Sequence, residues 1–100
     1  MIGVYITCKD KKEAKKIARY LLLKKLIGCA NIFPVDSLYW WKGKIANGKE
    51  TVILAKSIEK KYPMIVSEVK KIHSYEVPCI IKMKEDANKE YLKWIIGEVK

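Results

Sequence analysis

Residues Cys29 to Lys56 read CANIFPVDSLYWWKGKIANGKETVILAK, and the rest of the chain can be arranged around them. Two runs rich in β-branched and aromatic residues flank Asn47-Gly48, the dipeptide that best tolerates the two positive φ angles of a type I′ turn. The segment therefore predicts one long β-hairpin with a two-residue loop at Asn47-Gly48. This register places Trp41 opposite Leu54.

The first arm of this hairpin carries three consecutive aromatic residues, Tyr39, Trp40 and Trp41. Side chains alternate along a strand, so we expect Tyr39 and Trp41 on one face with Ile45, and Trp40 on the other. One small helical layer cannot cover apolar surface on both faces, and such a surplus marks an interface. We therefore expect the three aromatic residues to lie between copies of a closed symmetric oligomer. The alternative is that both tryptophans belong to the core.

The segment before the hairpin predicts a strand and a helix. An apolar run at residues 2–6 favours a strand covered by other elements. Asp10 is followed three residues later by Glu13, a spacing similar to a capping box. The first helix is expected over residues 11–26, with Gly28 at its C-terminal end.

The segment after the hairpin predicts two more helices and one more strand. Tyr62-Pro63 is a plausible helix start, and this second helix should reach His73. Residues 77–83 indicate the last main strand, and Asn88 suits the N-cap of a third helix. The order β-α-β-β-α-β followed by a helix is the α+β, ferredoxin-like pattern, an antiparallel four-stranded sheet with two helices on one face. We interpret residues 1–100 as a single domain of this kind.

The charge of the chain favours no particular partner. There are 21 Lys and Arg residues against 11 acidic residues, a formal net charge of +10, and Arg19 is the only arginine. Lysine is the weaker residue for bidentate recognition of phosphates and bases, and lysines scattered over every segment are typical of solvated surface. Nucleic acid is therefore not the expected partner. Stacking of single-stranded bases on Tyr39, Trp40 and Trp41 is the lesser alternative.

Composition also bears on location and stability. No apolar run approaches the ~20 residues of a membrane span, and the N-terminus lacks a basic region before an apolar one. The three cysteines, Cys8, Cys29 and Cys79, form no CxxC pair, so we expect reduced thiols. These features predict a cytoplasmic protein without a membrane partner. Abundant Lys, Glu and Ile hint at a thermostable one.

Four segments in the right order resemble the signature segments of the CutA family, the divalent-cation tolerance proteins. The segments are Cys29-Ala30-Asn31-Ile32, Ser37 to Ile45, His73 to Pro78, and Tyr91 to Ile95. The resemblance implies a ferredoxin-like subunit in a tight homotrimer that binds copper and other divalent metal ions. The same fold is similar to that of trimeric nitrogen-signalling regulators, so a signalling or small-molecule scaffold is the alternative.

The resemblance also implies metal ligands at Cys8 and His73. Many relatives carry a glutamate after the proline of the third segment, whereas this chain has Cys79 after Pro78, and a thiol there can bind a soft metal. The candidate ligands for copper(II) or another divalent cation are therefore His73, Cys8 and Cys79. A structural reading stands beside this one, with His73 capping a helix C-terminus and Cys8 or Cys29 buried as small apolar groups.

Catalysis is not expected from this sequence. Some small ferredoxin-like proteins hydrolyse acyl phosphates with an arginine in a glycine-bearing loop after the first strand, but the loop from Cys8 to Lys12 has neither residue. No common hydrolase, metalloprotease or nucleotide-binding motif is present either. His73, Tyr75 and Glu76 would form an acid–base cluster only if these consecutive loop residues converged. The expected function is divalent-metal binding and heavy-metal tolerance.

Overall fold

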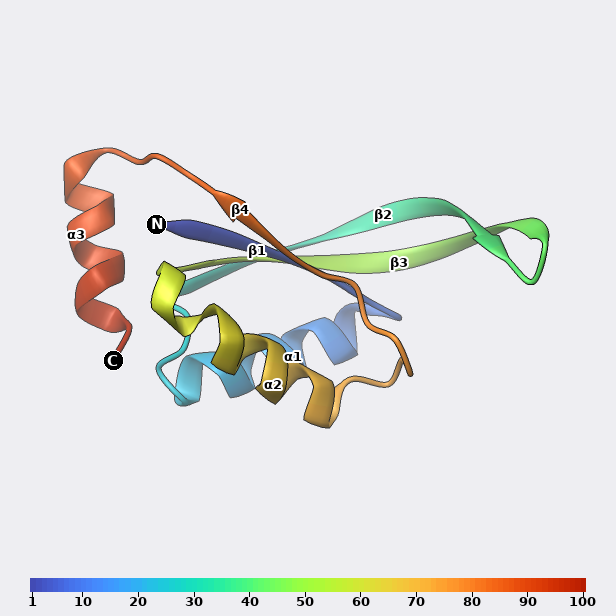
Figure 1. The fold of residues 1–100 in the computed structure, drawn as a ribbon, viewed down its shortest axis with the longest axis horizontal. Coiled ribbons are helices and arrows are strands. Elements are labelled where there is room, and N and C mark those ends of the chain that lie inside the picture. The colour runs from blue at the N-terminus through green and yellow to red at the C-terminus, as the bar shows by residue number, and fades with distance from the viewer.

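The computed structural model describes residues 1–100 as a four-stranded antiparallel sheet with three α-helices (Figure 1). The sheet order is β2-β3-β1-β4, with α1 and α2 side by side on one face and α3 beyond the end of the sheet. This arrangement confirms the α+β, ferredoxin-like fold. The elements are β1 (Ile2–Cys8), α1 (Lys11–Leu23), β2 (Cys29–Trp41), β3 (Lys44–Ser57), a 3-10 turn η1 (Glu59–Lys61), α2 (Tyr62–Ile72), β4 (Ile80–Lys84) and α3 (Lys89–Glu98).

The hairpin is present, but its turn lies five residues earlier along the chain than predicted. β2 pairs with β3 from Cys29 opposite Lys56 to Trp41 opposite Lys44, and the turn is Lys42-Gly43. Both turn residues have positive φ angles, 49° and 77°, as a type I′ turn requires. The predicted turn at Asn47-Gly48 is wrong, because these two residues lie inside β3.

The length of β2 explains the difference. A turn centred on Asn47-Gly48 would place Leu38 opposite Ser57, the last residue of β3. Residues 29–37 would then have no partner in β3, and their backbone groups would be unpaired on that side. Full pairing of both strands therefore outweighs the strain of holding Lys42 at a positive φ angle.

The new register changes which side chains share a face. Trp40 lies opposite Ile45, and Tyr39 lies opposite Ala46, so Ile45 shares a face with Trp40 rather than with Tyr39 and Trp41 as predicted. Trp40 is 73% exposed and Trp41 is 61% exposed, because this part of the hairpin projects beyond the other strands (Figure 1). Aromatic side chains are thus uncovered on both faces of the hairpin, and neither tryptophan belongs to the core of the single chain.

The core lies between the sheet and the two helices on its face. β1 is central in the sheet and directs Ile2, Val4, Ile6 and Cys8 toward these helices. Residues at helical spacing on α1 and α2 cover them, which is the expected role of an amphipathic helix. The helix and neighbouring-strand residues of the core are Ala14, Ile17, Ala18, Leu21, Leu26, Ile27, Ile53, Ala55, Ile65 and Val69.

The two ends of α1 are capped in different ways. The Asp10 carboxylate accepts the Glu13 backbone N–H at 2.8 Å, which confirms the predicted N-cap. The helix ends at Leu23 rather than at residue 26, because Lys25 takes a φ of 60° in place of the predicted glycine. The Leu26 N–H then donates to the Leu21 carbonyl at 3.0 Å, as in a Schellman motif. Gly28 instead allows close packing of α3, since a Cβ there would meet Ile95 at 2.9 Å.

A buried carboxylate joins α1 to α2. Glu68 accepts hydrogen bonds from the Tyr20 hydroxyl at 2.7 Å and from Lys71 Nζ at 2.7 Å, and Lys24 Nζ lies 3.2 Å away. These partners, Lys71 first, lower the pKa of Glu68 from 4.5 to about 2 although burial acts in the opposite direction. Glu68 is therefore ionised at neutral pH and holds the two helices together.

Replacement of Glu68 by Gln is expected to lower the melting temperature at neutral pH, because two lysines and a tyrosine lose a charged partner. The folded pKa lies below the ordinary value, so this stabilisation is complete above pH 4.5 and is lost as the pH falls toward 2. Thermal unfolding of both proteins should show a difference that shrinks over this acidic range. The exposed acid Glu90 provides a matched Gln control, and an equal effect in that control would contradict the assignment.

Candidate metal site

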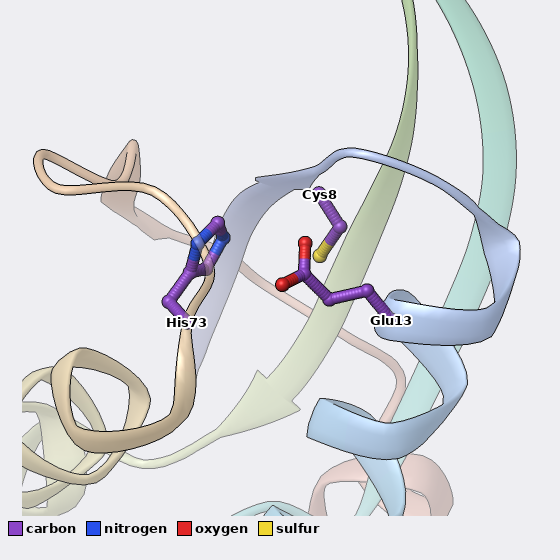
Figure 2. Close-up of side chains that lie close together, drawn as sticks. All are labelled: Cys8, Glu13 and His73. Carbon is purple, nitrogen blue, oxygen red and sulfur yellow. The ribbon is translucent and has the colours of Figure 1, made fainter.

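Three side chains with metal-ligating groups meet at the end of β1 (Figure 2). Cys8 is the last residue of β1, Glu13 lies in the first turn of α1, and His73 follows the last residue of α2. One ligand atom from each lies within 4.8 Å of the others. The structure thus brings together the predicted residues Cys8 and His73.

The other members of the site differ from the prediction. Cys79 precedes β4 and is not part of this cluster. The spacing after Asp10 predicts only a helix-capping role for Glu13, although Glu13 follows Cys8 by five residues, in the first turn of the next helix. In the structure the Glu13 carboxylate faces back toward Cys8 at the end of β1 (Figure 2). That spacing was the available sign of its role, and we define Cys8, Glu13 and His73 as the C-E-H cluster.

Both ring nitrogens of His73 are engaged by the backbone. Nδ1 accepts the Tyr75 N–H at 3.0 Å, and Nε2 lies 2.8 Å from the Thr7 carbonyl oxygen. Because a backbone N–H can only donate, Nδ1 carries no proton, and the ring proton on Nε2 donates to Thr7. This tautomer leaves no lone pair of the imidazole free. His73 therefore fastens the loop after α2 to the end of β1.

The carboxylate of Glu13 is also engaged on both oxygens. Oε1 accepts the Lys9 N–H at 3.0 Å, and Oε2 accepts the Ser74 N–H at 2.9 Å. Burial acts to raise the pKa of Glu13, but the hydrogen bonds from Ser74 and Lys9 hold it below 4.5. Glu13 is therefore an anion that ties α1 to the loops on both sides.

The thiol of Cys8 is fully buried beneath these groups. Burial, followed by the negative charges of Glu13, Asp10 and Glu50, raises the pKa of Cys8 from 9.0 to about 12. Since a metal binds the thiolate, a cation at this position must first displace a strongly held proton. In its present state Cys8 is an unreactive apolar group.

Tyr75 connects the loop after α2 to β3 by a hydrogen bond. Its hydroxyl donates to a Glu50 carboxylate oxygen at 2.7 Å, and its ring lies 4.8 Å from the His73 ring. Burial, followed by the interaction with Glu50, raises the pKa of the Tyr75 phenol. Glu76 is exposed and takes no part in these hydrogen bonds, so His73, Tyr75 and Glu76 do not converge on one point.

The C-E-H cluster has the chemistry of a divalent-metal site but not its open geometry. Imidazole, thiolate and carboxylate are suitable ligands for copper or zinc. In this structure, however, the imidazole lone pair is used and the thiol is protonated. The residues do not form a preorganised metal centre, because a cation must first break a hydrogen bond of His73 and remove the Cys8 proton.

Replacement of Glu13 by Gln is expected to destabilise the protein by about 1–3 kcal/mol, because the amide NH₂ would face a backbone N–H that loses its acceptor. The loss should be largest above pH 4.5 and decline below it, since the folded pKa of Glu13 lies under that value. Chemical denaturation against pH measures this difference. Glu76→Gln, a change of an exposed acid in the adjacent loop, is the control and should alter stability by less than ~0.5 kcal/mol. Equal stability of both variants would show that Glu13 does not hold these loops.

Comparison with known proteins relates the whole chain to one group. The profile of the CutA1 divalent ion tolerance protein family matches residues 2–98. The divalent-cation tolerance protein CutA of Archaeoglobus fulgidus is 44% identical over 93 residues, 92% of this chain and 91% of that protein. Its counterpart in Pyrococcus horikoshii is 41% identical over 101 residues, 100% of this chain and 99% of that protein.

Solved structures agree with the sequence comparison. CutA1 from Pyrococcus horikoshii superposes with a TM-score of 0.95 at 40% identity, over 100% of this chain and 99% of that one. The PII-like protein CutA from Nostoc superposes with a TM-score of 0.92 at 24% identity, over 100% and 98% of the two chains, and so shares the fold. The matches in sequence and structure, taken together, show that the chain belongs to the CutA1 divalent ion tolerance protein family.

Proposed function

We propose that this protein binds divalent cations, copper(II) first among them, as a homotrimer and so contributes to heavy-metal tolerance. The observation that carries the proposal is the C-E-H cluster, which gathers a thiol, a carboxylate and an imidazole within 4.8 Å in a chain of a divalent ion tolerance family. Nitrogen and sulfur ligands of this kind favour copper over harder cations such as magnesium. The cation is the cargo of the protein rather than a fixed part of its fold.

The closed state of the cluster determines what binding requires. Release of the Tyr75 N–H frees the lone pair of His73 Nδ1 for a metal, while the hydrogen bond from Nε2 to the Thr7 carbonyl keeps the imidazole oriented, as backbone carbonyls commonly do for ligating histidines. The Cys8 proton must leave, so affinity should rise with pH. Because a cation must replace the existing hydrogen bonds and the thiol proton, we expect it to bind with moderate affinity and to be released reversibly.

Copper(II) titration of the reduced protein, followed by calorimetry and electron paramagnetic resonance, is expected to show one copper ion per chain with nitrogen coordination. His73→Gln and Cys8→Ser should each lower the affinity by at least about 10-fold, because each removes a ligand and loss of a ligand's hydrogen-bond partner alone typically costs 10–100-fold. Cys79→Ser is the matched control for thiol removal, since Cys79 lies outside the cluster. Absence of stoichiometric copper, or unchanged binding in both ligand variants, would refute the proposed site.

The proposed homotrimer rests on the uncovered part of the hairpin. Leu38, Tyr39, Trp40, Trp41 and Ile45 are all exposed in the single chain. β2 is an edge strand, so its outer backbone groups are also available to a neighbouring copy. A closed ring of three chains would bury both features, and the aromatic triplet is the predicted contact.

Simultaneous replacement of Trp40 and Trp41 by Ser is expected to yield monomers or aggregates in native mass spectrometry, because it removes the largest apolar side chains of this surface. The matched control replaces Leu23 and Val77 by Ser. These two residues are 79% and 86% exposed and lie outside the hairpin, so their replacement should leave assembly intact. A stable trimer that persists in the tryptophan double variant would rule out the hairpin as the main contact.

A second candidate is a scaffold that binds a small molecule or a signalling partner. The backbone hydrogen bonds of Glu13 and His73 favour it, because they hold these side chains in place without a metal. A trimer that binds no copper in the titration would support this alternative.

We further propose a cytoplasmic location, while the related Archaeoglobus fulgidus structure is described as periplasmic. No helix here is both long and apolar enough to span a membrane.

A further inference from the structure

The outer side of α1 carries charges of one sign. Its five cationic residues are all exposed, whereas the residues on the opposite side are buried in the core. Successive residues of an α-helix are 100° apart, so the five cations occupy one continuous arc of about 140°. We call this surface the basic face; it consists of Lys11, Lys12, Lys15, Lys16 and Arg19.

No exposed acid on either packed helix offsets the basic face. The single acid of α1, Glu13, is buried and accepts two backbone hydrogen bonds. The single acid of α2, Glu68, is buried and paired with Lys24 and Lys71. Asp10 caps the start of α1 with its carboxylate. The acids of this layer are thus all engaged locally, and none forms an ion pair with the basic face.

The spacing within the basic face makes the cations repel one another. Lys11 and Lys15, Lys12 and Lys16, and Lys15 and Arg19 are each four residues apart, the separation at which side chains on a helix are neighbours. Like charges at this spacing destabilise a helix. A face that needs only to be solvated can alternate its charges and avoid this repulsion. No ion pair within the chain offsets this repulsion, so a bound anion would relieve it.

We propose that the basic face binds the phosphate backbone of double-stranded nucleic acid. The helix is about 20 Å long, enough to follow several phosphates along one strand. Lysine ammonium groups act as point charges, so the contact is independent of base sequence. This interaction goes beyond the proposed metal function and uses none of the residues of the C-E-H cluster.

Other polyanions fit the basic face less well. A helix that lies in a membrane surface needs a free apolar side, and the apolar side of α1 is packed against the sheet. A single-stranded nucleic acid is held by aromatic stacking, and the exposed Tyr39, Trp40 and Trp41 lie on the distant hairpin rather than on α1 (Figure 1). Duplex phosphates are therefore the favoured ligand.

The test is the fluorescence anisotropy of a labelled duplex DNA of about 20 base pairs, titrated at several potassium chloride concentrations. Wild-type protein should bind at low salt, and log K should fall linearly with log salt at a slope near −3 to −4. The variant K12Q/K16Q/R19Q should lose at least about tenfold in affinity and reduce the slope by about 2–3. The control K84Q/K89Q/K93Q has the same change in net charge on β4 and α3, and its slope should change by less than about 1.

Three results would overturn the proposal. Equal weakening of both triple variants would assign the binding to overall charge instead of the basic face. No binding of the wild-type protein at low salt would exclude a nucleic-acid partner. Binding to phosphatidylserine vesicles without binding to the duplex would assign the face to a membrane. Circular dichroism and native mass spectrometry of the variants must match wild type, and glutamine at these helical positions supports the fold.

Discussion

The pairing of β2 with β3 along the whole of β2 is the constraint on which the rest of the structure depends. It moves the turn to Lys42-Gly43 and makes β2 an edge strand, while pairing with β3 and β4 makes β1 central, so that its alternate residues face the helices. It also carries the aromatic triplet beyond the body of the domain. The projecting surface, the edge strand and the proposed assembly are all consequences of this one ladder.

The C-E-H cluster lies at the end of β1 from which the hairpin projects. Cys8 lies opposite Thr51 of β3, and the chain then turns into the Asp10 cap of α1. Buried polar groups need partners, and here every one is supplied by the backbone or by a neighbouring side chain. The cluster is thus held together without an ion, in contrast to a structural metal site, whose ligands depend on the bound ion for their folded arrangement.

Burial separates the charges of the helical layer. Glu13 and Glu68 are turned inward, where they connect α1 to its loops and to α2. The cations remain outside, because a long lysine side chain keeps its charged end in water. One set of acids thus stabilises the fold, and their inward placement leaves the basic face without compensation. The cations of α1 form a continuous surface because helical spacing puts them on the side opposite the core residues.

The order of elements, the two helical stripes and the Asp10 cap follow from the sequence because they depend on local periodicity and on hydrogen bonds between near neighbours. The pair Cys8 and His73 was accessible only through resemblance to relatives. Three other features depend on contacts between residues far apart in the chain. They are the turn position, the role of Glu13 and the hydrogen bond of His73 to the Thr7 carbonyl. Such contacts depend on which strand register and packing give every backbone group a hydrogen-bond partner. A local sequence pattern does not show which of the alternative registers achieves this.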